Sequence, residues 1–250
     1  MVAAVVLTGF SATASAQSGA RDLMFSIDTT GSMAPYIDQT KAAVEDMATD
    51  LASESAGTRV GLVEYRDQGG PFQSRTVADL TSDLPTFRTG LDGLSVAGGG
   101  DTPESVYSGI ARSLCQDWNA SSVRAIITIG DAPGKDPEPV TGLTADRIIA
   151  LANGTSDDNP YCPAAEARTA AVGPAAVPAG GVRVYVVSAD AGLTEQFARI
   201  AGETGGATVP VEDIEDIADA IKDTVGDIDD DAKGDGLFGS LSDLFGSSGS

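Results

Sequence analysis

The chain has 250 residues, 42% of them hydrophobic, which is enough to bury a substantial core. Its 37 acidic and 15 basic residues give a formal net charge of -22. This balance argues against nucleic acid as a partner, because Lys and Arg supply that affinity, and against anionic membrane surfaces. There is no histidine, so hydrolases with a histidine base are excluded, and a bound metal must be held by oxygen ligands, as magnesium, calcium and manganese are.

The amino-terminal residues are typical of an export signal. An apolar run at residues 2–10 precedes small residues that end in an A-x-A pattern at 14–16, and the run is too short to span a bilayer. We predict a signal peptide over residues 1–16, although the absence of a preceding Lys or Arg leaves a truncated start open. The mature protein is then expected to be secreted, extracytoplasmic or on the cell surface, without membrane insertion. In an exported protein, Cys115 and Cys162 are expected to form a disulfide.

Apolar runs alternate with helical patterns along the rest of the chain. The runs at 123–129 and 182–187 are typical of strands buried on both faces, as in parallel sheets. The alternation predicts one α/β domain over residues 20–227, with helices on both faces of its sheet. Strands are predicted at 23–27, 59–65, 75–78 (antiparallel, at an edge or in a hairpin), 123–129, 182–187 and 208–209. Helices are predicted after residue 32 up to Gly57, and at 85–94, 103–115, 143–152, 162–172, 193–203 and 211–225.

The carboxyl-terminal residues differ in composition from this domain. Residues 228–250 are rich in Asp, Gly and Ser and repeat a Leu-Phe-Gly-Ser motif at 237–240 and 244–247. We interpret them as a flexible acidic tail, with a docking or self-association motif as the alternative. The alternating Asp residues at 227, 229 and 231 resemble a calcium loop, but Ala232 replaces the required Gly and no Glu closes it, so we expect a disordered acidic run.

Three polar segments follow predicted strands or open a helix nearby, at residues 28–32, 101–102 and 130–131. Ligands of open α/β sheets bind beyond the carboxyl ends of the strands. Each segment carries short carboxylate or hydroxyl side chains, which suit a hard cation. Helix capping is the alternative interpretation of each of these side chains. Glu64 and Asp67, near the end of another strand, are interpreted as a solvated edge rather than as part of the site.

These segments resemble the metal ion-dependent adhesion site of the extracellular von Willebrand factor type A domains. The family's pattern is D-x-S/T-x-S, then a distant Thr and a distant Asp. Here D-T-T-G-S-M, G-G-G-D-T-P-E and T-I-G-D-A-P match it in order, and the resemblance covers about residues 22–225. It implies a metal site made of Asp28, Thr30, Ser32, Thr102 and Asp131.

The resemblance also implies a Rossmann-like three-layer sandwich with a central, mainly parallel six-stranded sheet. It implies Mg²⁺, or Mn²⁺ or Ca²⁺, bound partly through water, and a partner protein that supplies an Asp or Glu carboxylate. Asp101 and Glu104 are interpreted as structural or supporting residues. We expect an exported adhesion module that is not an enzyme. The alternatives are an assembly protein that acts through its tail and a metal-dependent hydrolase, for which an activated nucleophile or a second metal cluster is lacking.

Overall fold

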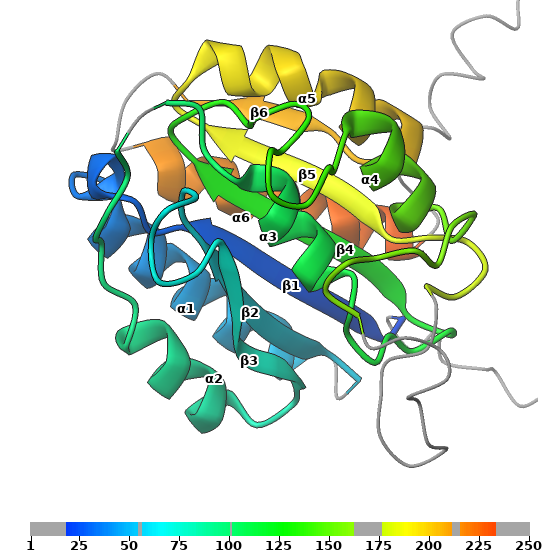
Figure 1. Cartoon of the computed structure of the whole chain (residues 1–250). Helices are drawn as coiled ribbons and strands as arrows, with labels where there is room; N and C mark the ends of the chain where they lie inside the picture. The colour runs from blue at the N-terminus through cyan, green and yellow to red at the C-terminus, as the bar shows by residue number, and fades with distance from the viewer. Residues whose placement is uncertain (1–18, 55–56, 101, 163–176, 212–215, 234–250) are drawn as a thin grey trace, which may run out of the picture.

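A six-stranded sheet forms the middle layer of the protein (Figure 1). The computed structural model describes residues 19–54, 57–100, 102–162, 177–211 and 216–233. The strand order is β3-β2-β1-β4-β5-β6, and every pair is parallel except β2 with β3. The strands are β1 (Arg21–Asp28), β2 (Arg59–Tyr65), β3 (Ser74–Thr81), β4 (Val123–Gly130), β5 (Arg183–Ser188) and β6 (Thr208–Pro210). The predicted mainly parallel six-stranded sheet, with its antiparallel edge strand, is confirmed.

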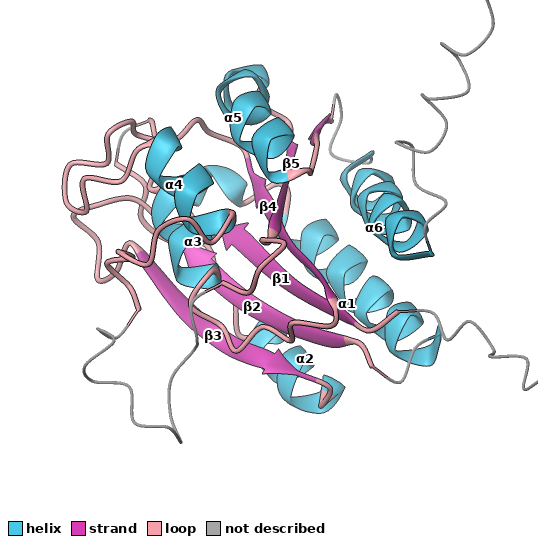
Figure 2. Cartoon of the chain, turned by 90° about the vertical axis from the view of Figure 1, so that its right-hand side faces the viewer, coloured by secondary structure: helices cyan, strands magenta, loops and turns pink. Residues whose placement is uncertain are grey.

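Helices cover both faces of the sheet, as Figure 2 shows from the side. One face carries α1 (Ile37–Glu54), α2 (Leu84–Asp92) and α6 (Ile217–Lys233), whose apolar side chains share one core cluster. The other face carries α3 (Val106–Ser113), α4 (Ala145–Ala152) and α5 (Ala191–Thr204), which share a second cluster. A short 3-10 turn, Gly31–Met33, lies between β1 and α1. The fold is therefore the predicted three-layer α/β sandwich.

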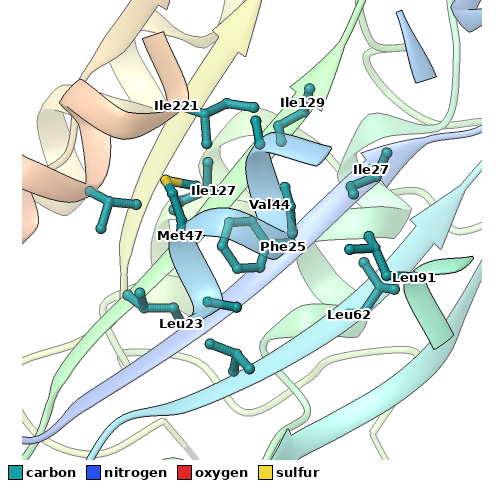
Figure 3. Close-up of a cluster of buried hydrophobic side chains, with 14 of the residues drawn as sticks. Leu23, Phe25, Ile27, Val44, Met47, Leu62, Leu91, Ile127, Ile129 and Ile221 are labelled. Atoms are coloured by element: carbon teal, nitrogen blue, oxygen red, sulfur yellow. The ribbon is translucent and has the colours of Figure 1, made fainter. Parts of the chain in front are cut away.

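Strand β1 lies at the centre of the sheet and is buried along its whole length. Because side chains alternate along a strand, Leu23, Phe25 and Ile27 pack under α1, α2 and α6 (Figure 3), while Met24 faces the second cluster. Burial on both faces explains the mostly apolar run at residues 23–27, which only Ser26 interrupts.

Helix α3 begins at Val106, three residues later than the sequence predicted. The preceding segment pairs instead with the loop after β4. The Glu104 amide donates to the Pro133 carbonyl at 2.8 Å, and the Glu104 carbonyl accepts from the Lys135 amide at 2.9 Å. This short bridge holds residue 104 in an extended pairing, so the helix cannot start there.

Helix α6 continues to Lys233, past the predicted start of the tail at residue 228. Ile221, Val225 and Ile228 are buried against the first core, at the spacing of one helix face. The acidic run that was interpreted as disordered therefore begins as the last turns of a packed helix. Residues 234–250, which include both Leu-Phe-Gly-Ser repeats, lie outside the described residues, as do the predicted signal peptide at 1–16 and most of the predicted helix at 162–172.

Cys115 and Cys162 form a disulfide with an S–S distance of 2.08 Å, which confirms the predicted pairing. The bridge joins the segment that follows α3 to the loop that follows α4. Among the helices in the described ranges, none is long and apolar enough to serve as a membrane span.

Candidate functional site

The candidate site lies at the carboxyl ends of the two central strands, β1 and β4. Asp28 is the last residue of β1, and Asp131 directly follows β4. The parallel register pairs Ile27 with Ile129, so the residues that follow each strand emerge side by side. This is the edge of an open α/β sheet where ligands are expected.

Four of the five predicted ligands form one chain of contacts. The Asp28 Oδ1 atom accepts hydrogen bonds from the amide and the hydroxyl of Thr30, both at 2.7 Å. The hydroxyl oxygens of Thr30 and Ser32 lie 3.0 Å apart, and the Ser32 hydroxyl donates to Asp131 Oδ1 at 2.9 Å. Thr30 precedes the 3-10 turn but makes no side-chain capping bond there. Its hydroxyl therefore serves the cluster and not the turn, contrary to the capping interpretation.

Asp28 is fully buried, and its Oδ2 atom has no hydrogen-bond partner among the described residues. The pKa of Asp28 is raised to about 7, mainly by burial and also by the charge of Asp131. The hydrogen bonds from Thr30 and the charge of Arg66 oppose this rise. Asp131 is half-buried, and its pKa is also raised, first by burial and also by Asp190, against the hydrogen bond from Ser32. The local environment thus leaves both carboxylates short of positive charge.

Thr102, the fifth predicted ligand, lies on the exposed loop before α3. Within the described residues, no hydrogen bond ties its hydroxyl to the other four, and its role as a ligand stays a prediction. The neighbouring Asp101 lies outside the described residues.

Glu104, which the sequence analysis interpreted as a structural or supporting residue, is buried near these side chains. It is 3% exposed, and its Oε2 atom has no hydrogen-bond partner among the described residues. Burial raises the pKa of Glu104 to about 8; Asp28, Asp67 and Asp131 raise it too, whereas Lys135 lowers it.

Glu64 and Asp67 do not form the solvated edge that was expected, since both are buried. Glu64 accepts a hydrogen bond from the Thr29 hydroxyl at 2.8 Å and is paired with Arg75. Asp67 is paired with the buried Lys135. These cationic partners come from other segments and make the burial of charge tolerable. Asp28 and Glu104, by contrast, each keep an oxygen without a partner.

The glycine-rich loop at residues 98–100 supports the site from one side. The Gly31 amide donates to the Gly98 carbonyl at 3.0 Å. Gly99 has a φ of +78°, and a Cβ atom there would lie 3.1 Å from the Cβ of Thr30 and 3.5 Å from Glu104 Oε1. A side chain at residue 99 would therefore be strained and would crowd the two flanking site residues.

The oxygen atoms gathered here fit a hard divalent cation better than a softer metal. No group of three or more His, Cys, Asp and Glu side chains poised for a metal was found in the described part of the chain. The set is instead a mixed one, in which two hydroxyls lie between two carboxylates, and such oxygen donors suit Mg²⁺, Mn²⁺ or Ca²⁺. The unpartnered Oδ2 of buried Asp28 is the atom that a cation would satisfy best.

Comparison with known proteins agrees with the fold. The family model of the von Willebrand factor A domain matches residues 22–153, more than half of the chain, and this range contains all five predicted ligands. The alpha-protein kinase vwkA of Dictyostelium discoideum is 30% identical over 114 residues. That match takes in 45% of this chain but only 18% of the kinase, so the similarity concerns a small part of that protein.

Proposed function

This chain belongs to the von Willebrand factor A domain family, and from that premise we propose that it is an exported, metal-dependent protein-binding module. Membership of the family supports a role in protein interaction. In the proposal, Asp28, Thr30, Ser32, Thr102 and Asp131 hold a divalent cation, Mg²⁺ or alternatively Mn²⁺ or Ca²⁺. A partner protein supplies an Asp or Glu carboxylate to the same cation.

The observation that carries this proposal is that the four contacting side chains have too few protons for the contacts that they make. Three oxygen–oxygen contacts connect Asp28, Thr30, Ser32 and Asp131, at 2.7, 3.0 and 2.9 Å. Each hydroxyl has one proton to donate, so two ionised carboxylates and two hydroxyls can make only two hydrogen bonds. The remaining contact needs either a protonated carboxyl or a cation among the oxygens. With the unpartnered Asp28 Oδ2 in addition, a divalent cation suits this set of atoms better than a single proton does.

The proposed ligand residues differ in exposure, and the exposed ones mark the side from which a partner could reach the cation. Asp28 and Thr30 are fully buried, whereas Ser32 and Thr102 are exposed and Asp131 is half-buried. A bound cation would supply positive charge and a coordination position open to a partner's carboxylate. Asp28 and Thr30 would bind the cation from the protein interior, and the partner would approach from the side of the exposed residues.

The charge of the chain supports strict dependence on the metal. With a net charge of -22, the protein repels acidic partners at long range. A partner carboxylate would also meet Asp28 and Asp131 at the site. Capture of an acidic residue therefore requires a cation to reverse the local sign of charge.

We propose binding and not catalysis, since the chain has no histidine and the site offers no nucleophile with an activating base. The proposal of export rests on the Cys115–Cys162 disulfide and on the signal-like pattern at residues 1–16. Mass spectrometry of the mature amino terminus tests it. Detection of residues 1–16 on the protein recovered from outside the cell would contradict a cleaved signal.

Calorimetric titration with Mg²⁺ and Mn²⁺ tests the metal site. The wild-type protein should bind one equivalent, and Asp28→Ala should bind none. Ser32→Ala is a milder second variant, because residue 32 is exposed and its loss should leave the fold intact. It should weaken binding while the thermal unfolding of the chelator-treated protein stays unchanged. Equal binding by all three proteins would place the cation elsewhere.

A display library of short peptides tests the partner chemistry. Peptides enriched on the Mg²⁺-loaded protein should contain Asp or Glu. Each should lose binding when that residue is changed to Asn or Gln, when the cation is chelated, or when Ser32→Ala replaces the wild type. Peptide binding that ignores chelation would contradict capture through a cation.

A further inference from the structure

We propose that a surface of arginine and aromatic side chains beside the candidate metal site binds a second acidic residue of the same partner protein. The surface consists of Phe72, Arg75, Arg112 and Tyr161, and we call it the arginine–aromatic surface. The inference rests on the proposed function and adds to it, because the partner would then present two carboxylates, one for the cation and one for Arg112.

Arg112, on α3, is an arginine without an acidic partner. Its Nε atom donates to the Ser74 hydroxyl at 3.2 Å, and its Cζ atom lies 4.2 Å from the centre of the Tyr161 ring. Among the described residues, no carboxylate or carbonyl accepts from its two terminal nitrogens, which carry four N–H donors. Neither nitrogen is among the buried atoms that lack a partner, so a ligand can reach both.

Several other arginines at the surface are each paired with an acid of this chain. The pairs are Arg59 with Asp22, Arg88 with Glu45, Arg147 with Asp158, and Arg199 with Asp146. With 37 acidic and 15 basic residues, the chain has acids to spare for its arginines. Burial lowers the pKa of Arg112, although Tyr161 opposes this, so the charge of Arg112 is partly desolvated without being neutralised. A carboxylate from outside the chain would neutralise it.

The Arg112 side chain is held in place before any partner binds. The Tyr161 ring on which it stacks is fixed by a hydrogen bond from its hydroxyl to the Ser108 hydroxyl oxygen at 2.6 Å. Cys162, next in sequence to Tyr161, is joined by the disulfide to Cys115, three residues after Arg112. A guanidinium fixed in this way loses little freedom on binding, and its planar N–H groups can donate to both oxygens of one carboxylate.

The rest of the arginine–aromatic surface lies at the start of β3. The centre of the Phe72 ring is 4.8 Å from the Cζ atom of Arg66 and 4.6 Å from that of Arg75. Phe72 is half-buried and Arg75 is exposed. Arg75 is next in sequence to Ser74, which accepts from Arg112, so three guanidinium groups gather in a chain whose net charge is -22. Arginine and aromatic side chains are the types enriched where proteins bind one another.

The surface and the metal site lie at the same edge of the sheet. Tyr65, the last residue of β2, pairs with Asp28 on one side and with Ser74 on the other. Ser74 is therefore two strand spacings, roughly 10 Å, from the strand end that carries Asp28. About three residues of extended chain span that distance, so one short segment of a partner can reach the cation and Arg112 together.

The acidic peptides that a display library yields on the Mg²⁺-loaded protein are the probe. Each should contain a second Asp or Glu, about three or more residues from the first. Arg112→Gln should bind them about 10-fold more weakly or worse, because a charged hydrogen-bonded pair is lost. Titration with Mg²⁺ alone should give closely similar affinities for Arg112→Gln and the wild type, since Arg112 is not a ligand.

Arg199→Gln is the matched control. Arg199 is an exposed arginine of α5, so the variant removes the same charge from the protein away from the arginine–aromatic surface. Peptide affinity should change by about 2-fold at most, as expected for an exposed charge screened by salt.

A double-mutant cycle distinguishes a contact with the peptide from an effect on the fold. Changing the second acidic residue of a peptide to Asn or Gln should weaken its binding to the wild type by a similar factor. The same change should leave binding to Arg112→Gln almost unaltered, because the contact is already lost. Two losses that simply multiply would show that this residue does not meet Arg112, and would overturn the inference.

The remaining outcomes separate the inference from the proposed function. Peptides without a second acidic residue, or equal affinities of Arg112→Gln and Arg199→Gln, would overturn the inference and leave the metal site standing. Binding that survives chelation but is lost in Arg112→Gln would contradict the metal-dependent function and leave the surface as a binding site. If the wild type binds neither Mg²⁺ nor any acidic peptide, both are wrong.

Discussion

Glu138 shows how one buried carboxylate can organise the start of a helix that lies elsewhere in the chain. Ser105, the residue that precedes α3, makes no side-chain capping bond. Glu138 caps the helix in its place, since it accepts from the Ser108 amide at 2.8 Å, from the Ser108 hydroxyl, and from the Thr141 hydroxyl at 2.9 Å. The first turn of α3, which begins at Val106, is thus fixed by a residue from the loop after β4.

The titration of Glu138 should leave a signature in the stability of the protein. Burial raises the pKa of Glu138 above its usual value, although hydrogen bonds from Ser108 and Thr141 lower it. A raised pKa means that folding favours the protonated form. The stabilisation that the protonated form provides is complete below the pKa of this group in the unfolded chain, about 4.3. It is lost as the pH rises through the pKa of the group in the folded protein. The unfolding free energy of wild type minus that of Glu138→Gln should therefore fall as the pH rises from about 4.

Urea unfolding of both proteins across this pH range measures the difference. Because the variant lacks only this titrating group, subtracting its unfolding free energy from that of the wild type removes the contribution of every other acid. A difference that is constant with pH, or that grows toward neutral pH, would contradict the raised pKa.

The positions of most site residues could be predicted from sequence, but their electrostatic partners could not. Asp28 and Asp131 follow apolar strands, so their place at the edge of the sheet follows from the strand pattern alone. Glu64 and Asp67 look equally exposed in sequence, yet both are buried, because Arg75 and Lys135 reach them from other segments. The burial of Glu104, with one carboxylate oxygen that has no partner among the described residues, is likewise not visible in the local sequence.

Helix α3 owes its close packing on the sheet to Gly109. A Cβ atom at this position would lie 2.6 Å from the Ser26 hydroxyl oxygen and 2.7 Å from a ring carbon of Tyr65. Gly226, in the interior of α6, has open space where its Cβ would stand. Two glycines in helices thus serve different purposes, and only the first is required by packing.

Substitution by alanine should change stability in opposite directions at these two positions. Gly226→Ala should stabilise the protein by about 0.5–1 kcal/mol, through helix propensity alone. Gly109→Ala should destabilise it by about 1–3 kcal/mol, because the added methyl group forces α3 away from β1 and β2. Chemical denaturation of both variants gives the comparison. A stabilised Gly109→Ala would show that α3 packs less closely on the sheet than its contacts indicate.

The elements themselves differ in how far local sequence determines them. The strands were predicted within about two residues at most ends, because burial on both faces requires continuous apolar runs. Helix ends were less predictable. The bridge between residues 104 and 134 delays the start of α3, and burial of Ile228 extends α6 into an acidic run. Both boundaries depend on contacts with distant segments, which local patterns do not contain.

For the molecule as a whole, the Cys115–Cys162 bridge is a covalent constraint on the second face of the sheet. Its two cysteines are 47 positions apart in sequence, and the loop between them includes β4, Asp131 and α4. By the chain-entropy estimate, closing a loop of this length stabilises the folded state by about 4 kcal/mol.

The double variant Cys115→Ser/Cys162→Ser should therefore unfold at a clearly lower urea concentration than the oxidised wild type. The expected loss is about 4 kcal/mol, and wild type treated with a reducing agent should show a similar loss. Under native conditions the fold should persist, because two apolar clusters on either side of the sheet hold it together. Equal denaturation midpoints for oxidised wild type and double variant would show that the bridge contributes nothing.

The central position of β1 in the sheet also determines how early during synthesis the proposed cation could first bind. β1 is the earliest strand of the sheet to be synthesised, and one of its two neighbours, β4, is made much later. Ser32 and Asp131, which touch in the site, are separated by 99 positions in sequence. A chain that has emerged only through β3 therefore has half a sheet and no complete site. If the chain is exported in an unfolded state, the proposed cation would be loaded only afterwards and would come from the surroundings outside the cytoplasm.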